Sequence, residues 1–267
     1  WWVAFTIPLL TSYKQVHYRA TAGQAGEAIR GTFAELGSTF RAIRKNKPLW
    51  MFMIAFFFYI DAVNTVISMS TSYGTQLGID STQLVVALLV TQFVAFPCSI
   101  IYGKLAGRFG SKTMITAAVV AYMCIVFFAA FFLRAALEFW ILAILVGMFQ
   151  GGIQALSRSY YGKIIPKDHA NEYYGFYDIF GKTASIIGPF LVATTTSLTG
   201  NASIGVLSIA ILLAVALVAL AAVAHAAWNL AIKRAGTGGA VFLWLTFVVG
   251  AVLFAPVGVL TLTQSGT

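Results

Sequence analysis

The chain has 267 residues, of which 60% are hydrophobic, 15% aromatic and only 9% charged, and its mean hydropathy is +0.86. A soluble domain is about half apolar and about a quarter charged, so this composition excludes one and predicts an all-α, polytopic transmembrane helical bundle. The net charge of +9 is explained by cationic connections on the cytoplasmic side of a lipid bilayer, and we expect no binding to nucleic acid.

Continuous apolar runs, rather than alternating ones, predict helices that cross the bilayer. A crossing needs about 20 apolar residues, because each residue rises about 1.5 Å through about 30 Å of hydrocarbon. The opening run, 1–13, is shorter and is predicted to be the end of a truncated transmembrane helix. The full-length runs are 49–72, 83–103, 112–133, 139–161, 174–198, 203–233 and 240–261.

Positive charge alternates along the connections between these runs. The connections rich in Lys and Arg are 14–48, 104–112 and 158–173, and the poor ones are 73–82, 134–138 and 199–202. The positive-inside rule therefore places the rich connections in the cytoplasm. We expect an integral, multi-pass protein of a bacterial inner membrane.

Segment 14–48 is predicted to be a cytoplasmic linker. Its apolar residues recur at helical spacing, namely Ile29, Phe33, Leu36, Phe40 and Ile43. This spacing predicts an amphipathic helix on the inner leaflet, and a solvated linker fits the composition equally well. After the first run, Asp80 is predicted to be a turn residue, with Ser81 and Thr82 capping the next helix.

Residues 103–112 (GKLAGRFGSK) lie in one of the predicted cytoplasmic loops. They resemble the loop motif of the major facilitator superfamily, in which glycines such as Gly103 and Gly110 permit a tight turn and cations such as Arg108 and Lys112 hold the loop at the inner face. The aspartate of the family motif is replaced by Gly107 in this chain. The resemblance assigns these motif residues to gating.

Four further stretches resemble the vacuole-effluxer-like branch of that superfamily: 59–67, 152–160, 175–182 and 188–190. Members of that branch have two pseudo-symmetric six-helix halves. The resemblance covers 1–212 and implies that 49–212 is the six-helix carboxy-terminal bundle, whose partner is a missing amino-terminal half. It also implies a secondary transporter, and not an enzyme, that exports small solutes by alternating access, with amino acids as the first candidate substrate.

The end of the chain resembles a different family. Residues 225–234 (HAAWNLAIKR) and 242–244 (FLW) are similar to the start of a drug/metabolite (EamA-type) transporter. We therefore expect 213–267 to form a helical hairpin from a second family, joined to the first somewhere around 208–220. Such a join explains why the run 203–233 is too long for one perpendicular crossing.

A polar stripe runs along the first full-length helix. Asp61, Asn64, Thr65 and Ser68 recur at i, i+3, i+4 and i+7. The functional interpretation is a cavity-lining face whose carboxylate carries a proton, and the alternative is a helix-packing face. Because an isolated ionised carboxylate is unfavourable in the membrane, we expect Asp61 either to take up a proton or to meet a cation such as Lys182.

The helix predicted over 139–161 carries a second polar row. Gln150, Gln154 and Arg158 follow one another at i+4 spacing, and they either line a cavity or form interhelical hydrogen bonds. Small residues on the adjoining face predict close helix packing. They are Gly147, Gly151 and Ala155.

The helix predicted over 174–198 begins with an acid and a base. Asp178 and Lys182 are four residues apart and would neutralise each other. The alternative is a cytoplasmic gate in which Asp178 pairs with Arg158 of the preceding helix. No metal-ligand spacing and no nucleotide-binding motif occurs in the sequence, so we expect no cofactor, and a proton or substrate gradient as the energy source. The rival hypothesis is a non-transporting membrane module.

Overall fold

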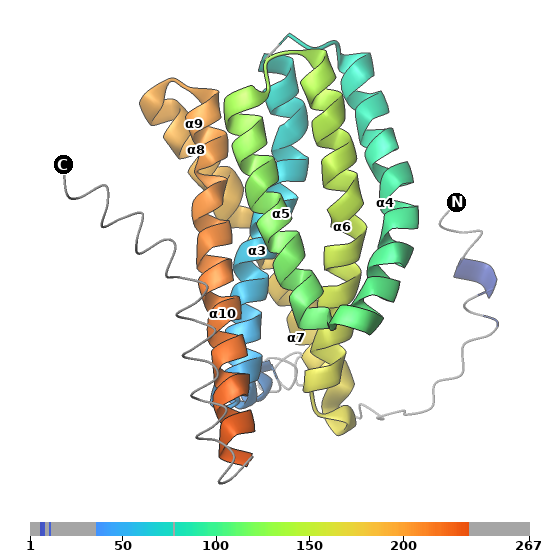
Figure 1. Cartoon of the computed structure of the whole chain (residues 1–267), viewed down its shortest axis with the longest axis vertical. Coiled ribbons are helices and arrows are strands. Elements are labelled where there is room, and N and C mark those ends of the chain that lie inside the picture. The colour runs from blue at the N-terminus through green and yellow to red at the C-terminus, as the bar shows by residue number, and fades with distance from the viewer. Residues whose placement is uncertain (1–5, 9–10, 12–35, 77, 235–267) are drawn as a thin grey trace, which may run out of the picture.

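Long helices packed side by side form the described part of the chain (Figure 1). The computed structural model describes residues 6–8, 11, 36–76 and 78–234, with only the backbone for 225–234. Within the described ranges, five helical stretches are long and apolar enough to cross a membrane, which confirms the predicted all-α membrane bundle. They are α3 (Lys47–Gln76), α4 (Ser81–Phe109), α5 (Ser111–Phe132), α6 (Ala136–Ile164) and the residues Ala202–Ala224, which span α9 (Ala202–Leu207) and most of α10 (Ile209–Arg234).

The run predicted as one helix over 174–198 is interrupted. After η1 (Lys167–His169), it consists of α7 (Ala170–Thr183), the 3-10 turn η2 (Ala184–Ile186) and α8 (Ile187–Thr199). Ser185 leaves the helical region, with φ −78° and ψ 21°. Pro189 has no amide hydrogen and cannot donate to the Ser185 carbonyl, so the sequence itself disfavours an unbroken helix here.

Connections of like charge lie at the same end of the bundle. The start of α3, the α4–α5 turn and the α6–α7 connection lie toward the lower end, and the α3–α4, α5–α6 and α8–α9 connections lie at the upper end (Figure 1). The three connections rich in Lys and Arg are therefore the lower ones. We call this lower end the cationic end.

The motif 103–112 forms less loop than the sequence predicts. Gly103 and Arg108 lie in the last turns of α4, and Lys112 lies in the first turn of α5, so Gly110 alone connects the two helices. Gly110 has φ +86°, a conformation that residues with a Cβ rarely adopt. A single residue reverses the chain because glycine tolerates this backbone.

Residues 36–45 of the predicted linker are helical and pack on the cationic end of the bundle. Ile43 is fully buried, and the Phe40 ring lies 5.6 Å from the Trp50 ring and 5.9 Å from the Phe176 ring, measured between centroids. This part of the linker therefore forms a helix with one face on the bundle, and its position on the inner leaflet stays a prediction. Ile29 and Phe33 lie outside the described residues.

The start of α4 and the small-residue face of α6 differ in part from the prediction. Asp80, rather than Ser81 or Thr82, is the N-cap of α4, and its carboxylate accepts from the Thr82 amide at 2.9 Å. Gly147 and Gly151 do pack against α4, because an added Cβ would lie 2.7 Å from the Thr91 carbonyl and 2.9 Å from the Ala95 carbonyl, respectively. Ala155, the third residue of that predicted face, is exposed instead.

The α10 backbone is helical across the predicted boundary between 212 and 213. Leu213, Ala216 and Val223 are buried, and α10 packs along α3 and α5. The run predicted over 240–261 lies outside the described residues. The second-family origin of 213–267 stays a prediction.

Candidate functional site

A cavity of about 630 Å³ lies between α3, α6 and α7. Its polar lining consists of Asn64, Gln154, Arg158, Asp178 and Lys182. All five are candidate residues from the sequence, and they come from α3 and from the consecutive helices α6 and α7, which lie much further along the chain. Phe56, Ile60 and Tyr177 supply apolar lining. The cavity thus offers two cations, one carboxylate and two amides beside an apolar wall.

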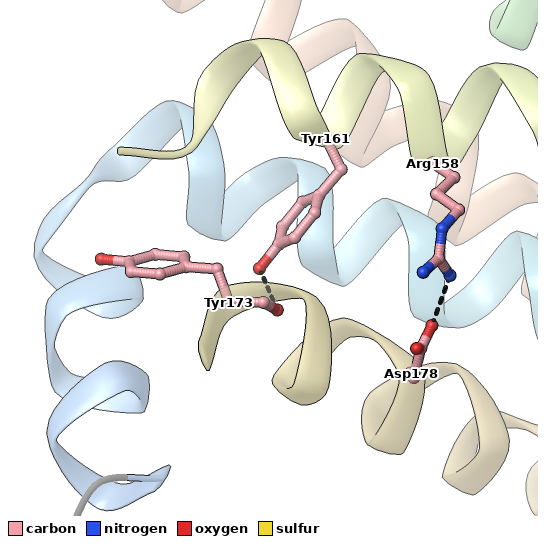
Figure 2. A network of polar contacts seen from close by, with 4 residues as sticks. All are labelled: Arg158, Tyr161, Tyr173 and Asp178. Carbon is pink, nitrogen blue, oxygen red and sulfur yellow. Dashed lines mark hydrogen bonds and ion pairs between the residues drawn. The ribbon is translucent and has the colours of Figure 1, made fainter. Parts of the chain in front are cut away.

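An ion pair crosses this cavity from α6 to α7, as predicted. Arg158 Nη1 donates to Asp178 Oδ1 at 2.7 Å, and the two side chains are 54% and 47% exposed (Figure 2). The guanidinium carbon also lies 5.0 Å from the centre of the Tyr174 ring. Among the described residues Asp178 forms no ion pair with Lys182, so the predicted self-neutralisation within α7 does not occur.

A second contact between the same helices is buried. The Tyr161 hydroxyl donates to the Tyr173 carbonyl at 3.0 Å (Figure 2). The Tyr161 ring also packs at 4.8 Å from the Tyr177 ring and 5.8 Å from the Tyr174 ring. This aromatic layer packs α7 on α6 beside the ion pair, and Tyr174 contacts both Tyr161 and Arg158.

Asp61 lies outside the cavity, in the contact between α3 and the broken helix. Its carboxylate is fully buried, and Oδ2 accepts from the Gly188 amide at 2.9 Å, at the start of α8. In the described part of the chain Oδ1 has no hydrogen-bond partner, and Lys182 forms no ion pair with it. Of the two predicted states of Asp61, pairing with a cation is therefore absent among the described residues, where the carboxylate accepts a backbone amide instead, and protonation stays a prediction.

Glycine is required at the other side of this contact. An added Cβ at Gly188 would overlap the Thr65 hydroxyl and lie 3.0 Å from Asp61 Oδ1. Thr65 is fully buried, and its hydroxyl donates to the Asp61 carbonyl at 2.7 Å. Asp61 and Thr65 therefore form a packing face, whereas Asn64 on the same helix faces the cavity.

The remaining residues of the two polar rows are divided in the same way. Asn64 Nδ2 donates to Ser185 Oγ at 2.8 Å, which ties the cavity face of α3 to the helix break. Ser68 is exposed and is not among the cavity-lining residues, and its hydroxyl donates to the Thr65 carbonyl at 3.3 Å. Gln154 lines the cavity, whereas Gln150 Oε1 is buried without a partner among the described residues.

A buried contact between α3 and α6 was not predicted from the sequence. Tyr59 and Ser157 are fully buried, with their oxygens 2.6 Å apart. The Ser157 hydroxyl hydrogen goes to the Ile153 carbonyl at 2.5 Å, so Tyr59 is the donor to Ser157. Both residues lie inside the stretches that carry the family resemblance, and this position is the feature of the sequence that could have indicated the contact.

The motif residues lie at the cationic end, outside the cavity. Gly103 and Arg108 are exposed, and the Arg108 guanidinium lies 5.6 Å from the Phe109 ring centre. Lys112 Nζ lies 5.7 Å from the centre of the Tyr160 ring on α6. Contacts to the end of α6, rather than to α7, thus anchor this turn. The described residues contain no group of three His, Cys, Asp or Glu that could hold a metal ion.

Known proteins similar to this chain are transporters and vacuolar effluxers. YxiO of Bacillus subtilis (strain 168), described as an uncharacterized MFS-type transporter, is 53% identical over 206 residues, which cover 77% of this chain and 47% of YxiO. Autophagy-related protein 22 of Saccharomyces cerevisiae (strain ATCC 204508 / S288c) is 29% identical over 180 residues, covering 63% of this chain and 34% of the relative. The chain thus spans less than half the length of these relatives.

A more distant relative extends the match along the chain. Autophagy-related protein 22 of Cryptococcus neoformans (strain JEC21) is 24% identical over 225 residues, or 78% of this chain and 39% of its own length. The family model for vacuole effluxer Atg22-like proteins matches residues 1–227. This chain therefore belongs to the vacuole effluxer Atg22-like family.

Proposed function

We propose that the chain provides one six-helix bundle of a secondary transporter of the major facilitator type, in a bacterial inner membrane. The observation that carries the proposal is the cavity whose polar lining gathers Asn64, Gln154, Lys182 and the Arg158–Asp178 pair in an otherwise apolar bundle. Polar and charged groups are costly in a membrane unless they line an aqueous path or meet a partner. An amino-terminal half that rocks against this bundle would complete the pathway.

The substrate class we propose is small zwitterions, with amino acids first. The cavity presents Lys182 and Arg158 to a carboxylate and Asp178 to an ammonium group. Asn64 and Gln154 offer amide donors and acceptors to polar side chains. Export is the proposed direction, because two of the relatives are members of a family described as vacuole effluxers.

The coupling we propose is to protons, through Asp61. Its buried position and the unpaired Oδ1 favour a carboxyl that binds a proton when the pathway hydrates. Asn64 bonds to Ser185 at the helix break, three residues before the amide that Asp61 accepts. A movement of the interrupted segment between α7 and α8 would therefore displace both the cavity-lining Asn64 and the hydrogen bond of the Asp61 carboxylate.

The gate we propose is the Arg158–Asp178 pair. Half-exposed side chains can exchange partners at small cost, because the charges remain partly hydrated when they separate. A substrate carboxylate would compete with Asp178 for Arg158. Opening would thus be linked to substrate entry.

Counterflow of radiolabelled amino acids in proteoliposomes tests the function. The chain is reconstituted alone and together with the part of YxiO that it does not match. Substrate-dependent exchange in either preparation, lost in Gln154→Ala and Lys182→Ala, supports the transporter. No exchange in both, with the chain correctly inserted, would favour the rival of a non-transporting membrane module.

The coupling has a separate test. In Asp61→Asn, exchange should persist while accumulation driven by a pH gradient is lost, because the side-chain oxygen of Asn still accepts from the Gly188 amide but the side chain cannot take up or release a proton. Undiminished uphill transport in this variant would refute the proton-carrier role and leave Asp61 as a packing residue.

A further inference from the structure

An apolar groove lies between α5 and α10, which pack against each other, and Phe52 of α3 and Tyr160 of α6 also line it. Lys112, in the first turn of α5, places the groove near the cationic end of the bundle. Its volume is about 540 Å³. Ile115 and Val120 of α5 and Leu220 and Val223 of α10 supply apolar walls. The groove shares no lining residue with the polar cavity and plays no part in the proposed transport path.

One end of this groove is polar and positively charged. Lys112 and Thr113, in the first turn of α5, line it there, and Thr116 follows one turn later. Lys163 of α6 reaches the same place, because its Nζ donates to Ser111 Oγ at 3.3 Å. Within the described ranges neither lysine forms an ion pair with an acid. Two cations without an acidic partner among the described residues thus flank one end of a groove with a largely apolar lining.

We propose that the groove is a binding site for an anionic phospholipid. Lys112 and Lys163 contact the headgroup phosphate, the Thr113 hydroxyl donates to it, and one acyl chain lies against Ala117, Val120 and Ala224, the exposed apolar residues of the lining. Basic pockets between transmembrane helices on the cytoplasmic side are suited to anionic headgroups. The cationic end is the one that the positive-inside rule assigns to that side.

Selectivity in this site comes from charge rather than from the acyl chain. A lipid tail has the same apolar surroundings in the bilayer as in the groove, so moving it from one to the other changes the free energy little. Each lysine beside an anionic headgroup strengthens binding about fivefold. Loss of Lys112 should therefore weaken binding of an anionic lipid about fivefold and binding of a zwitterionic lipid less, because its choline cation offsets the phosphate charge.

Native mass spectrometry of the full chain in mild detergent measures this directly, with phosphatidylglycerol, phosphatidylcholine and inorganic phosphate as probes. We expect phosphatidylglycerol to bind the unmodified chain more tightly than the other two probes do. Its affinity should fall about fivefold in Lys112→Ala and stay unchanged in Lys112→Arg. Lys104→Ala is the matched control, because Lys104 is an exposed cation at the same end that does not line the groove. Equal losses in Lys112→Ala and Lys104→Ala would overturn the site in favour of diffuse surface attraction.

Two further measurements distinguish the possible occupants. Ala117→Trp fills the groove without changing charge and should reduce phosphatidylglycerol binding. If phosphate alone competes as well as the whole lipid, the site is an anion site and the lipid proposal is wrong. A photocrosslinker at Val120 should capture lipid. Capture of residues 235–267 of the chain itself would overturn the proposal.

Discussion

Asp61 and Asp80 accept the same kind of hydrogen bond in opposite surroundings. Each carboxylate receives a backbone amide at 2.9 Å at the start of a helix: Asp80 from Thr82, and Asp61 from Gly188, which lies 127 residues further along the chain. Asp80 is exposed and caps its own helix, whereas Asp61 is fully buried and caps a helix from another part of the bundle. Losing the exposed cap lets water replace it, but losing the buried one leaves an amide without a partner.

The largest effect should come from the glycine that makes the buried cap possible. Gly188→Ala would place a methyl group on Thr65 and Asp61 and should destabilise the protein by about 3 kcal/mol. Gly175→Ala is the control, because an added Cβ there meets nothing within 4 Å, and alanine favours a helix. Thermal unfolding in detergent measures both. Equal stability of the two variants would contradict the close contact.

The Asp61 side chain should come next. Asp61→Ala leaves the buried Gly188 amide unpaired and should cost about 2 kcal/mol. Asp61→Asn retains an acceptor oxygen and should cost less. Unfolding curves of the two variants measure the difference in stability. If Asp61→Asn lost as much stability as Asp61→Ala, the charge of Asp61 rather than its hydrogen bond would stabilise this contact.

The buried Tyr59–Ser157 contact gives a similar asymmetry on a smaller scale. Ser157→Ala strands the Tyr59 hydroxyl and should cost about 1.5 kcal/mol, whereas Tyr59→Phe leaves Ser157 bonded to the Ile153 carbonyl and should cost about half as much. The double variant should be no worse than Ser157→Ala alone. Strict additivity in unfolding experiments would show that the two hydroxyls do not interact.

At the exposed cap we expect a smaller loss that depends on pH. Hydrogen bonds from Thr82 lower the pKa of the Asp80 carboxyl. The stabilisation is therefore complete above the unfolded-state pKa of about 4 and is lost as pH falls through the lower folded-state pKa. Asp80→Asn, which keeps a good N-cap, should remove this dependence. A stability profile of the wild type that stays flat down to acidic pH would contradict the cap.

The smallest effect should be that of the Arg158–Asp178 pair. A double-mutant cycle with Arg158→Gln and Asp178→Asn should give a coupling of about 0.5 kcal/mol, because both side chains are half-exposed. If removing one partner instead destabilised the protein by about 3–5 kcal/mol, as is typical of a buried ion pair, water would have to be excluded from the cavity. Added salt should reduce the coupling.

The sequence predicted what depends on local pattern and missed what depends on distant contacts. Apolar runs predicted the long helices, and charge alternation predicted which connections share an end of the bundle. The Arg158–Asp178 pair was predictable because both residues flank one connection. The Asp61–Gly188 contact was not, because its partner is a backbone amide that is free only where Pro189 and Ser185 interrupt the helix. Hydropathy reports no such break.

That interruption also bears on how the chain enters the membrane. At about 1.5 Å per residue, α7 with 14 residues and α8 with 13 are each too short to span the hydrocarbon alone. During synthesis α3 emerges first, so the Asp61 carboxylate is in place before the amide of Gly188 leaves the ribosome. We therefore expect α7 and α8 to insert into the membrane with the help of contacts to α3, which is already in place. A reporter fused after residue 199 should then reach the side of the membrane opposite the cationic end less often when Asp61 is replaced by Ala.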